Sequence, residues 1–173
     1  IKEERGVVMG CSNNDFSLES LDGLKRYSEK LDNVFFTWRE YAQERIGGAY
    51  DPFLDIICKM YKELASENYE NFDEFLTQCG VYELHREILN SYYETGVCSR
   101  TEGILADELE YEQERMTNTI SLMLKTVAEY KPIVVVINRF HLASESTALL
   151  VRSLLEKPSE QIRVILGFRA YAS

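Results

Sequence analysis

The apolar residues of this 173-residue chain form one unbroken run and several segments with helical spacing. The run, Ile133–Ile137, consists of five β-branched residues, which is typical of a strand buried on both faces of a parallel sheet. A shorter run at residues 162–166 predicts a second strand, and the leucines between the two runs have the spacing of an amphipathic helix. Together they predict one parallel strand–helix–strand unit with a right-handed crossover.

The rest of the chain has a mainly helical pattern. From Ser17 to about Arg45, apolar residues recur three or four positions apart or at multiples of those spacings, which predicts one long helix or two broken ones. Asp51-Pro52 predicts the start of the next helix, and Asn71 can cap a further one. More helices are predicted after Gly80 and from residue 105 to about 131, whereas the short apolar run at residues 6–9 predicts a strand. The residues that carry the first helical pattern are Leu18, Leu21, Leu24, Leu31, Phe35 and Trp38.

Composition narrows the class of protein. A hydrophobic content of 45% and a charged content of 28% predict a globular domain with a real core. The net charge of -10 argues against direct nucleic-acid binding, and no apolar run approaches the roughly 18 residues of a membrane span. The four cysteines form no Cys-x-x-Cys pair, which favours reduced thiols in a cytoplasmic protein over a zinc site. Because the chain begins with Ile1, we interpret it as a piece of a longer protein.

Polar residues follow the central strand directly. Asn138, Arg139 and His141 lie just beyond its carboxyl end, where open α/β sheets bind their ligands. Thr147 stands six positions after His141, and Arg169 follows the second strand. This stretch resembles the Walker B and sensor 1 region of signal-transduction P-loop ATPases, the STAND branch of the AAA-like proteins. The segment Tyr50-x-Pro52-Phe53, at the start of a predicted helix, is similar to the same family.

The resemblance implies an α/β fold that is a fragment of a P-loop NTPase fold, with a predominantly helical remainder. Residues 1–173 would form one partial domain, with parallel strands at 6–9, 133–137 and 162–166 and with 133–137 in the middle. Residues 17–46 would be a helical insertion, because the family connection is shorter. The strand and glycine-rich loop that hold the phosphates should precede Ile1. The bare edge of strand 162–166 would be covered by self-association, a loop or a terminal segment.

The resemblance also assigns roles to four residues. Asn138 and Arg139 occupy the two acidic Walker B positions. Asn138 offers a neutral oxygen to a magnesium-bound water, and Arg139 can contact a phosphate or form a surface ion pair. His141 would sense the nucleotide state, or cap or pack a helix. Arg169 would reach the γ-phosphate, or face solvent. ATP and Mg are expected in the full-length parent, and neither is expected on this fragment alone.

Three functions remain open at this point. The first is a regulatory nucleotide-binding module of a multidomain signalling or transcription-regulating protein, with slow or no hydrolysis and with protein partners or self-association. The second is an active ATPase with an unusual Walker B segment. The third is a non-enzymatic helical protein-interaction domain. A glycine-rich phosphate loop upstream of Ile1 would separate the first two functions from the third.

Overall fold

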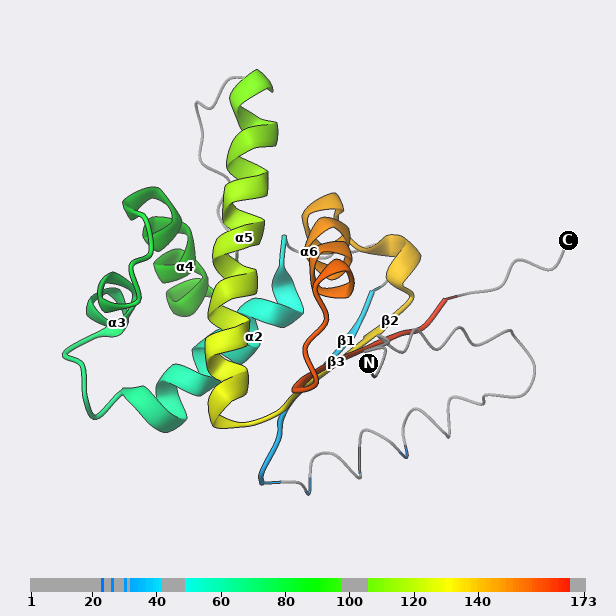
Figure 1. Ribbon diagram of the computed structural model, residues 1–173, viewed down its shortest axis with the longest axis horizontal. Coiled ribbons are helices and arrows are strands. Elements are labelled where there is room, and N and C mark those ends of the chain that lie inside the picture. Colours follow the sequence, from blue (N-terminus) through cyan, green and yellow to red (C-terminus); the bar gives the residue numbers. More distant parts are fainter. Residues whose placement is uncertain are drawn as a thin grey trace, which may run out of the picture.

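The computed structural model describes residues 32–41, 49–97 and 106–168, together with Gly23, Arg26 and Lys30. These residues form a mixed α/β structure, in which helices pack on a three-stranded parallel sheet (Figure 1). The strands are β1 (Phe35–Glu40), β2 (Ile133–Asn138) and β3 (Ile162–Leu166). The helices are α2 (Asp51–Met60), α3 (Phe72–Gln78), α4 (Glu83–Thr95), α5 (Ala106–Tyr130) and α6 (Glu145–Glu156), with a π-helical segment η1 (Tyr61–Ala65) and a 3₁₀ turn η2 (Phe140–Leu142).

The strand order is β1-β2-β3, and both pairs are parallel. Phe35, Ile133 and Ile162 lie side by side in the first row of the sheet. The prediction that residues 133–137 form the central strand, with 162–166 as a parallel neighbour, is therefore confirmed. The strand predicted at residues 6–9 lies outside the described residues.

The helix predicted over residues 35–40 is wrong, because these residues form β1 and pair with β2. The spacing of Leu31, Phe35 and Trp38 imitates a helical face. However, Phe35–Trp38 is also rich in aromatic residues that favour strands, and a turn at Asp32–Asn33 precedes it. Residues 35–40 of the expected helical insertion, 17–46, are therefore part of the sheet, whereas most of residues 17–31 and all of residues 42–46 lie outside the described residues.

The core lies between the sheet and helices α2, α5 and α6. In the central strand Ile133, Val135 and Ile137 have no exposed surface and face these helices. Fully burying one such side chain stabilises the fold by about 1.5–3 kcal/mol. The helices contribute the other fully buried aliphatic and aromatic side chains, among them Phe53, Leu54, Ile56, Ile57, Ile120, Leu124 and Leu150.

Helix ends follow the local signals in the sequence. The side chain of Asn71 accepts a hydrogen bond from the backbone N–H of Glu74 at 2.9 Å and caps α3, as predicted. Gly80, with φ of 73°, separates α3 from α4 in a left-handed conformation that suits glycine. Helix α5 ends just before Pro132, which cannot supply a backbone N–H to continue it. No helix of the described residues is long and apolar enough to cross a membrane.

A buried histidine joins α4 to α5. His85 is only 2% exposed, and its two ring nitrogens lie 3.1 Å from Thr119 Oγ1 and 3.4 Å from Glu112 Oε2. Burial lowers the pKa of His85, while the hydrogen bond and negative charge of Glu112 oppose this and the charge of Arg115 adds to it. The neutral imidazole is thus the form that the folded protein prefers.

This preference predicts a pH-dependent loss of stability. Below the ordinary His pKa of 6.5, the unfolded chain binds a proton at His85 before the folded protein does. The free energy of unfolding should therefore fall as the pH drops below that value, until the lowered folded-state pKa is passed. Urea unfolding across mildly acidic pH should show a smaller fall in His85→Asn than in the unaltered protein. His141→Asn, which keeps His85, is the control, and equal falls in all three proteins would contradict the prediction.

Candidate functional site

The carboxyl ends of the three strands meet at one edge of the sheet. Backbone hydrogen bonds continue past the strands there, since Gly167 N donates to Ile137 O at 2.8 Å. Phe140 N then donates to Gly167 O at 2.9 Å, and Tyr41 N donates to Asn138 O at 3.3 Å. The residues that follow β1, β2 and β3 are therefore held to one another, which fixes the backbone of the predicted site.

Asn138 lies at the centre of this edge with its side-chain oxygen already engaged. Its Oδ1 accepts a hydrogen bond from the backbone N–H of Arg139 at 2.9 Å. The same oxygen lies close to Gly167: a Cβ atom added to Gly167 would be only 2.6 Å from Asn138 Oδ1. A side chain at position 167 would overlap this amide. Asn138 therefore has a structural role, because its oxygen bonds the backbone of Arg139 and packs against Gly167.

Arg139 presents its side chain at the surface beside the end of β1. Its backbone adopts the left-handed conformation, with φ of 56° and ψ of 45°. Arg139 Nε lies 3.6 Å from Glu40 Oε1, and the two side chains are 43% and 44% exposed. An exposed pair of this kind contributes about 0–1 kcal/mol to stability. An anion with stronger acceptor oxygens could therefore replace Glu40 as the partner of Arg139.

The other two predicted site residues, His141 and Arg169, do not lie at the strand ends with Asn138 and Arg139 in the described part of the chain. His141 is exposed on η2, two positions beyond Arg139 in the turn that leaves the sheet. Arg169 lies outside the described residues. The structure thus brings Asn138 and Arg139 together at the edge and places His141 in the adjoining turn.

Thr147 and Tyr50, two further positions that carry the resemblance, are in direct contact although 97 positions separate them. The backbone N–H of Tyr50 donates to Thr147 Oγ1 at 3.1 Å. Ser144 Oγ, which caps α6, lies 3.0 Å from the same hydroxyl. Thr147 has no exposed surface, so this hydrogen-bonded group fixes the start of α2 against the start of α6 inside the protein.

A second polar cluster was not predicted. Arg39 Nη2 lies 3.0 Å from Asp51 Oδ1 and 2.7 Å from Asp55 Oδ2. The hydroxyl of Tyr92 lies 2.6 Å from Asp51 Oδ1 and 2.7 Å from Asp55 Oδ1. Burial raises the pKa of Tyr92, and the hydrogen bonds and charges of the two carboxylates raise it further. The cluster ties β1, α2 and α4 together, and its one sequence signal is the i, i+4 spacing of Asp51 and Asp55.

The described residues do not fit a protein-held magnesium ion. Among them no group of three or more His, Cys, Asp or Glu residues could hold a metal ion. Asn138, the predicted metal contact, offers one neutral oxygen that already accepts a hydrogen bond. Magnesium sites generally use one or two carboxylates, and the carboxylate of Glu40 at this edge pairs with Arg139.

Comparison with models of known protein families finds no match, and comparisons with curated proteins and with solved structures find none either.

The approach of Asn138 to Gly167 gives a stability test. Gly167→Ala should destabilise the protein by about 1–3 kcal/mol, because the new Cβ would overlap the Asn138 side chain. In an Asn138→Ala background that obstacle is gone, so the same substitution should cost clearly less. Urea unfolding of the four proteins measures this coupling. Gly23→Ala is the control, since an added Cβ there meets nothing within 4 Å. Equal costs in both backgrounds would contradict the proposed overlap.

The contact between Tyr50 and Thr147 gives a second test. Thr147→Val keeps the side-chain shape and removes the buried acceptor of the Tyr50 N–H. Loss of a buried acceptor costs about 1–3 kcal/mol of unfolding free energy. Thr126→Val is the matched control, because Thr126 is exposed and its hydroxyl donates to the carbonyl oxygen of Leu122 one turn earlier. Thermal or urea unfolding should separate the two variants, and similar small losses would mean that the Tyr50–Thr147 bond contributes little.

Proposed function

We propose that this chain belongs to the regulatory nucleotide-binding module of a larger signalling protein, and that the module hydrolyses ATP slowly or not at all. The observation that carries the proposal is the exposed Arg139 at the carboxyl edge of the parallel sheet, beside an Asn138 that is locked in place. An edge of this kind is the usual ligand site of open α/β sheets.

Arg139 supplies the chemistry for a phosphate. A guanidinium group binds phosphate oxygens through two parallel hydrogen bonds, which its surface pair with Glu40 does not match in strength. Nucleotide binding would exchange one acidic partner of Arg139 for another. The cost of breaking the Arg139–Glu40 pair is small because both side chains are well exposed.

The arrangement of the chain also agrees with the family resemblance. With β1 at residues 35–40, Tyr50 follows the strand by ten positions, so the long connection inferred from a strand at residues 6–9 disappears. Tyr50 opens α2, and its backbone contacts Thr147. Two separate pieces of the family pattern are thus adjacent in space, which supports the resemblance without depending on Asn138 or Arg139.

Slow hydrolysis follows from the side chains at the edge. A general base must be a group that can accept a proton close to the attacking water. Asn138 cannot accept one, and Arg139 is a permanent cation, so neither residue at the two acidic positions of the family pattern can serve as a base. The regulatory reading is therefore favoured over an active ATPase.

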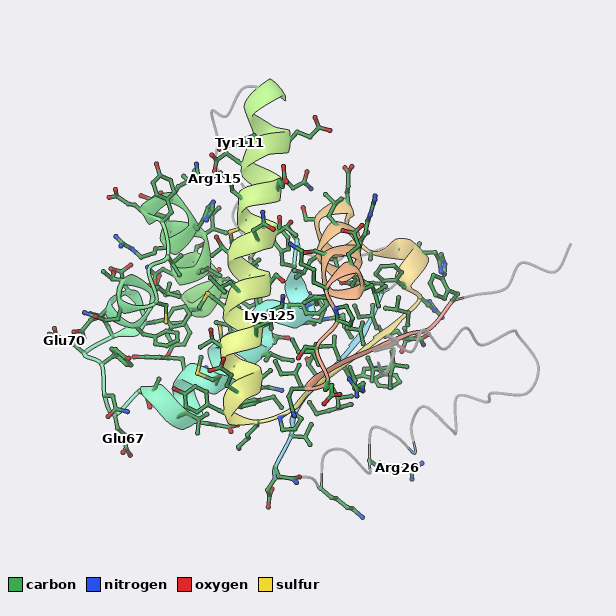
Figure 2. The ribbon with its side chains drawn as sticks, viewed as in Figure 1. Arg26, Glu67, Glu70, Tyr111, Arg115 and Lys125 are labelled. Carbon is green, nitrogen blue, oxygen red and sulfur yellow. The ribbon has the colours of Figure 1, made fainter. Side chains whose placement is uncertain are left out.

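A specific surface feature favours a second candidate, a protein-interaction domain. Arg115 on α5 lies over the ring of Tyr82 at 4.7 Å and over that of Tyr111 at 5.7 Å. Figure 2 shows Arg115 and Tyr111 near one end of α5, away from the sheet. The two tyrosines are 54% and 62% exposed. Tyrosine and arginine are enriched in protein interfaces, so this cluster suits a protein partner independently of any nucleotide.

Nucleotide binding by the full-length protein tests the proposal. Mg-ATP binding should weaken about tenfold to a hundredfold in Arg139→Ala, because one charge-assisted phosphate contact is worth about 1.5–3 kcal/mol. Arg152→Ala is the matched control, since Arg152 is an exposed arginine paired with Glu156 on α6. Isothermal titration calorimetry gives the affinities, and phosphate release on the same samples gives the turnover.

The two parts of the proposal fail separately. Ordinary ATPase turnover in the unaltered protein would overturn slow hydrolysis, and an Arg139→Ala affinity equal to that of Arg152→Ala would overturn the phosphate site. Protein binding that is lost in Tyr111→Ala and unaffected by nucleotide would favour the interaction domain instead. The 173-residue chain alone should bind Mg-ATP weakly, because a phosphate-cradling loop is expected outside it.

A further inference from the structure

Two exposed tyrosines from different parts of the chain hold the same guanidinium group. The central carbon of the Arg115 guanidinium lies 4.7 Å from the ring centre of Tyr82 and 5.7 Å from that of Tyr111. Tyr82 directly precedes α4, whereas Tyr111 and Arg115 lie about one turn apart on α5. Glu112 Oε1 lies 3.0 Å from Arg115 Nη1. Two ring faces and one carboxylate thus form a site that fits a guanidinium, and a side chain of the same chain occupies it.

The site is open to solvent, so its occupant can be exchanged. Tyr82 and Tyr111 are more than half exposed, and the side chain of Arg115 is 38% exposed. Exposed ion pairs and exposed cation–π contacts are each weak. A second guanidinium in place of Arg115 would contact the same rings and the same carboxylate, and Arg115 would regain its hydration. The exchange of one cation for another is therefore nearly neutral at the site itself.

Acidic side chains beside the two tyrosines favour a cation that comes from outside. Glu83 follows Tyr82, Glu110 and Glu114 flank Tyr111, and all three glutamates are exposed. Residues 110–115 contain three glutamates and one arginine, so this part of the surface is negative even with Arg115 in place. Such a surface attracts a basic segment and repels an acidic one.

We propose that this patch on α4 and α5 binds an arginine-containing basic segment of a protein partner, and that one partner arginine takes the place of Arg115 between Tyr82 and Tyr111. The inference rests on the second candidate function, the protein-interaction domain, and gives the chemistry of its partner. Arginine suits the site better than lysine, because a planar guanidinium stacks on aromatic rings as Arg115 does here. Figure 2 shows Tyr111 and Arg115 near the end of α5 that lies away from the sheet, so the patch is separate from the edge that carries Arg139.

Replacement of Arg115 tests the exchange. Arg115→Gln vacates the two ring faces and should strengthen binding of a fluorescein-labelled peptide of alternating glycine and arginine by about twofold to fivefold. Arg152→Gln is the matched control, since Arg152 is an exposed arginine paired with a glutamate on its own helix and its loss changes the net charge equally. Fluorescence anisotropy with the full-length protein gives the affinities. Equal affinities in the two variants, or weaker binding in Arg115→Gln, would overturn the proposal.

Replacement of Tyr111 tests the ring faces. Tyr111→Ala should weaken binding of the same peptide by about twofold to fivefold, whereas Tyr111→Phe keeps the ring and should bind as the unaltered protein does. Tyr130→Ala is the matched control, because Tyr130 is 66% exposed at the other end of α5. If Tyr111→Ala weakened binding no more than Tyr130→Ala does, the rings would not be the binding site and the proposal would fail.

Two further titrations separate the patch from general charge attraction and from the nucleotide site. A peptide of alternating glycine and lysine has the same charge and should bind more weakly, and equal affinities for the two peptides would exclude recognition by the rings. Arg139→Ala should bind the arginine peptide as the unaltered protein does, because Arg139 lies at the sheet edge. A loss of peptide binding in that variant would overturn the location on α4 and α5. Failure of the peptide tests leaves nucleotide binding through Arg139 untouched.

Discussion

Parallel pairing along β2 is the constraint on which the rest of the structure depends. A parallel pair needs a long crossover between its strands, and here the two crossovers carry all the helices from α2 to α6. The same pairing brings the carboxyl ends of all three strands to one edge. It therefore fixes both the place of the candidate site and the side of the sheet on which the helices pack. Any change that shifted the register of β2 would disturb the core and the edge together.

At that edge local structure and ligand chemistry compete for the same atoms. Asn138 Oδ1 accepts a hydrogen bond from the backbone N–H of Arg139. Gly167 has no side chain that would overlap this oxygen. The side chain of Arg139 is less constrained, because it pairs with an exposed carboxylate 3.6 Å away. The net charge of -10 opposes an approaching polyphosphate, although salt screens that repulsion beyond about 8 Å.

The sequence was sufficient for the strands and helices whose signals are local. The β-branched run of β2, the Asn71 cap and the stop at Pro132 each indicate one structure only. β1 was missed because Leu31, Phe35 and Trp38 continue a helical spacing across the turn at Asp32–Asn33. Residues 35–40 form a strand because they pair with β2, which lies about a hundred residues later in the chain. No pattern among neighbouring residues contains that information.

The sequence also predicted only part of the candidate site. That polar residues follow β2 is visible in the sequence, and from this Asn138 and Arg139 were placed at the edge. That Asn138 lies over Gly167, and that Arg39 meets two aspartates and Tyr92, depends on the register of the strands and the packing of α2 and α4. These contacts join residues that are far apart in the chain, so only the folded structure brings them together.

Arg39 and Glu40, the last two residues of β1, form ion pairs on opposite faces of the sheet. Arg39 points toward the helices and pairs with Asp51 and Asp55, whereas Glu40 points the other way and pairs with Arg139. An anion that took Glu40's place beside Arg139 would leave the Arg39 cluster intact. Binding at the edge would then change a surface pair without disturbing the core. The Arg39 cluster and the Arg139–Glu40 pair thus lie on opposite faces of the sheet although their β1 residues are neighbours in the chain.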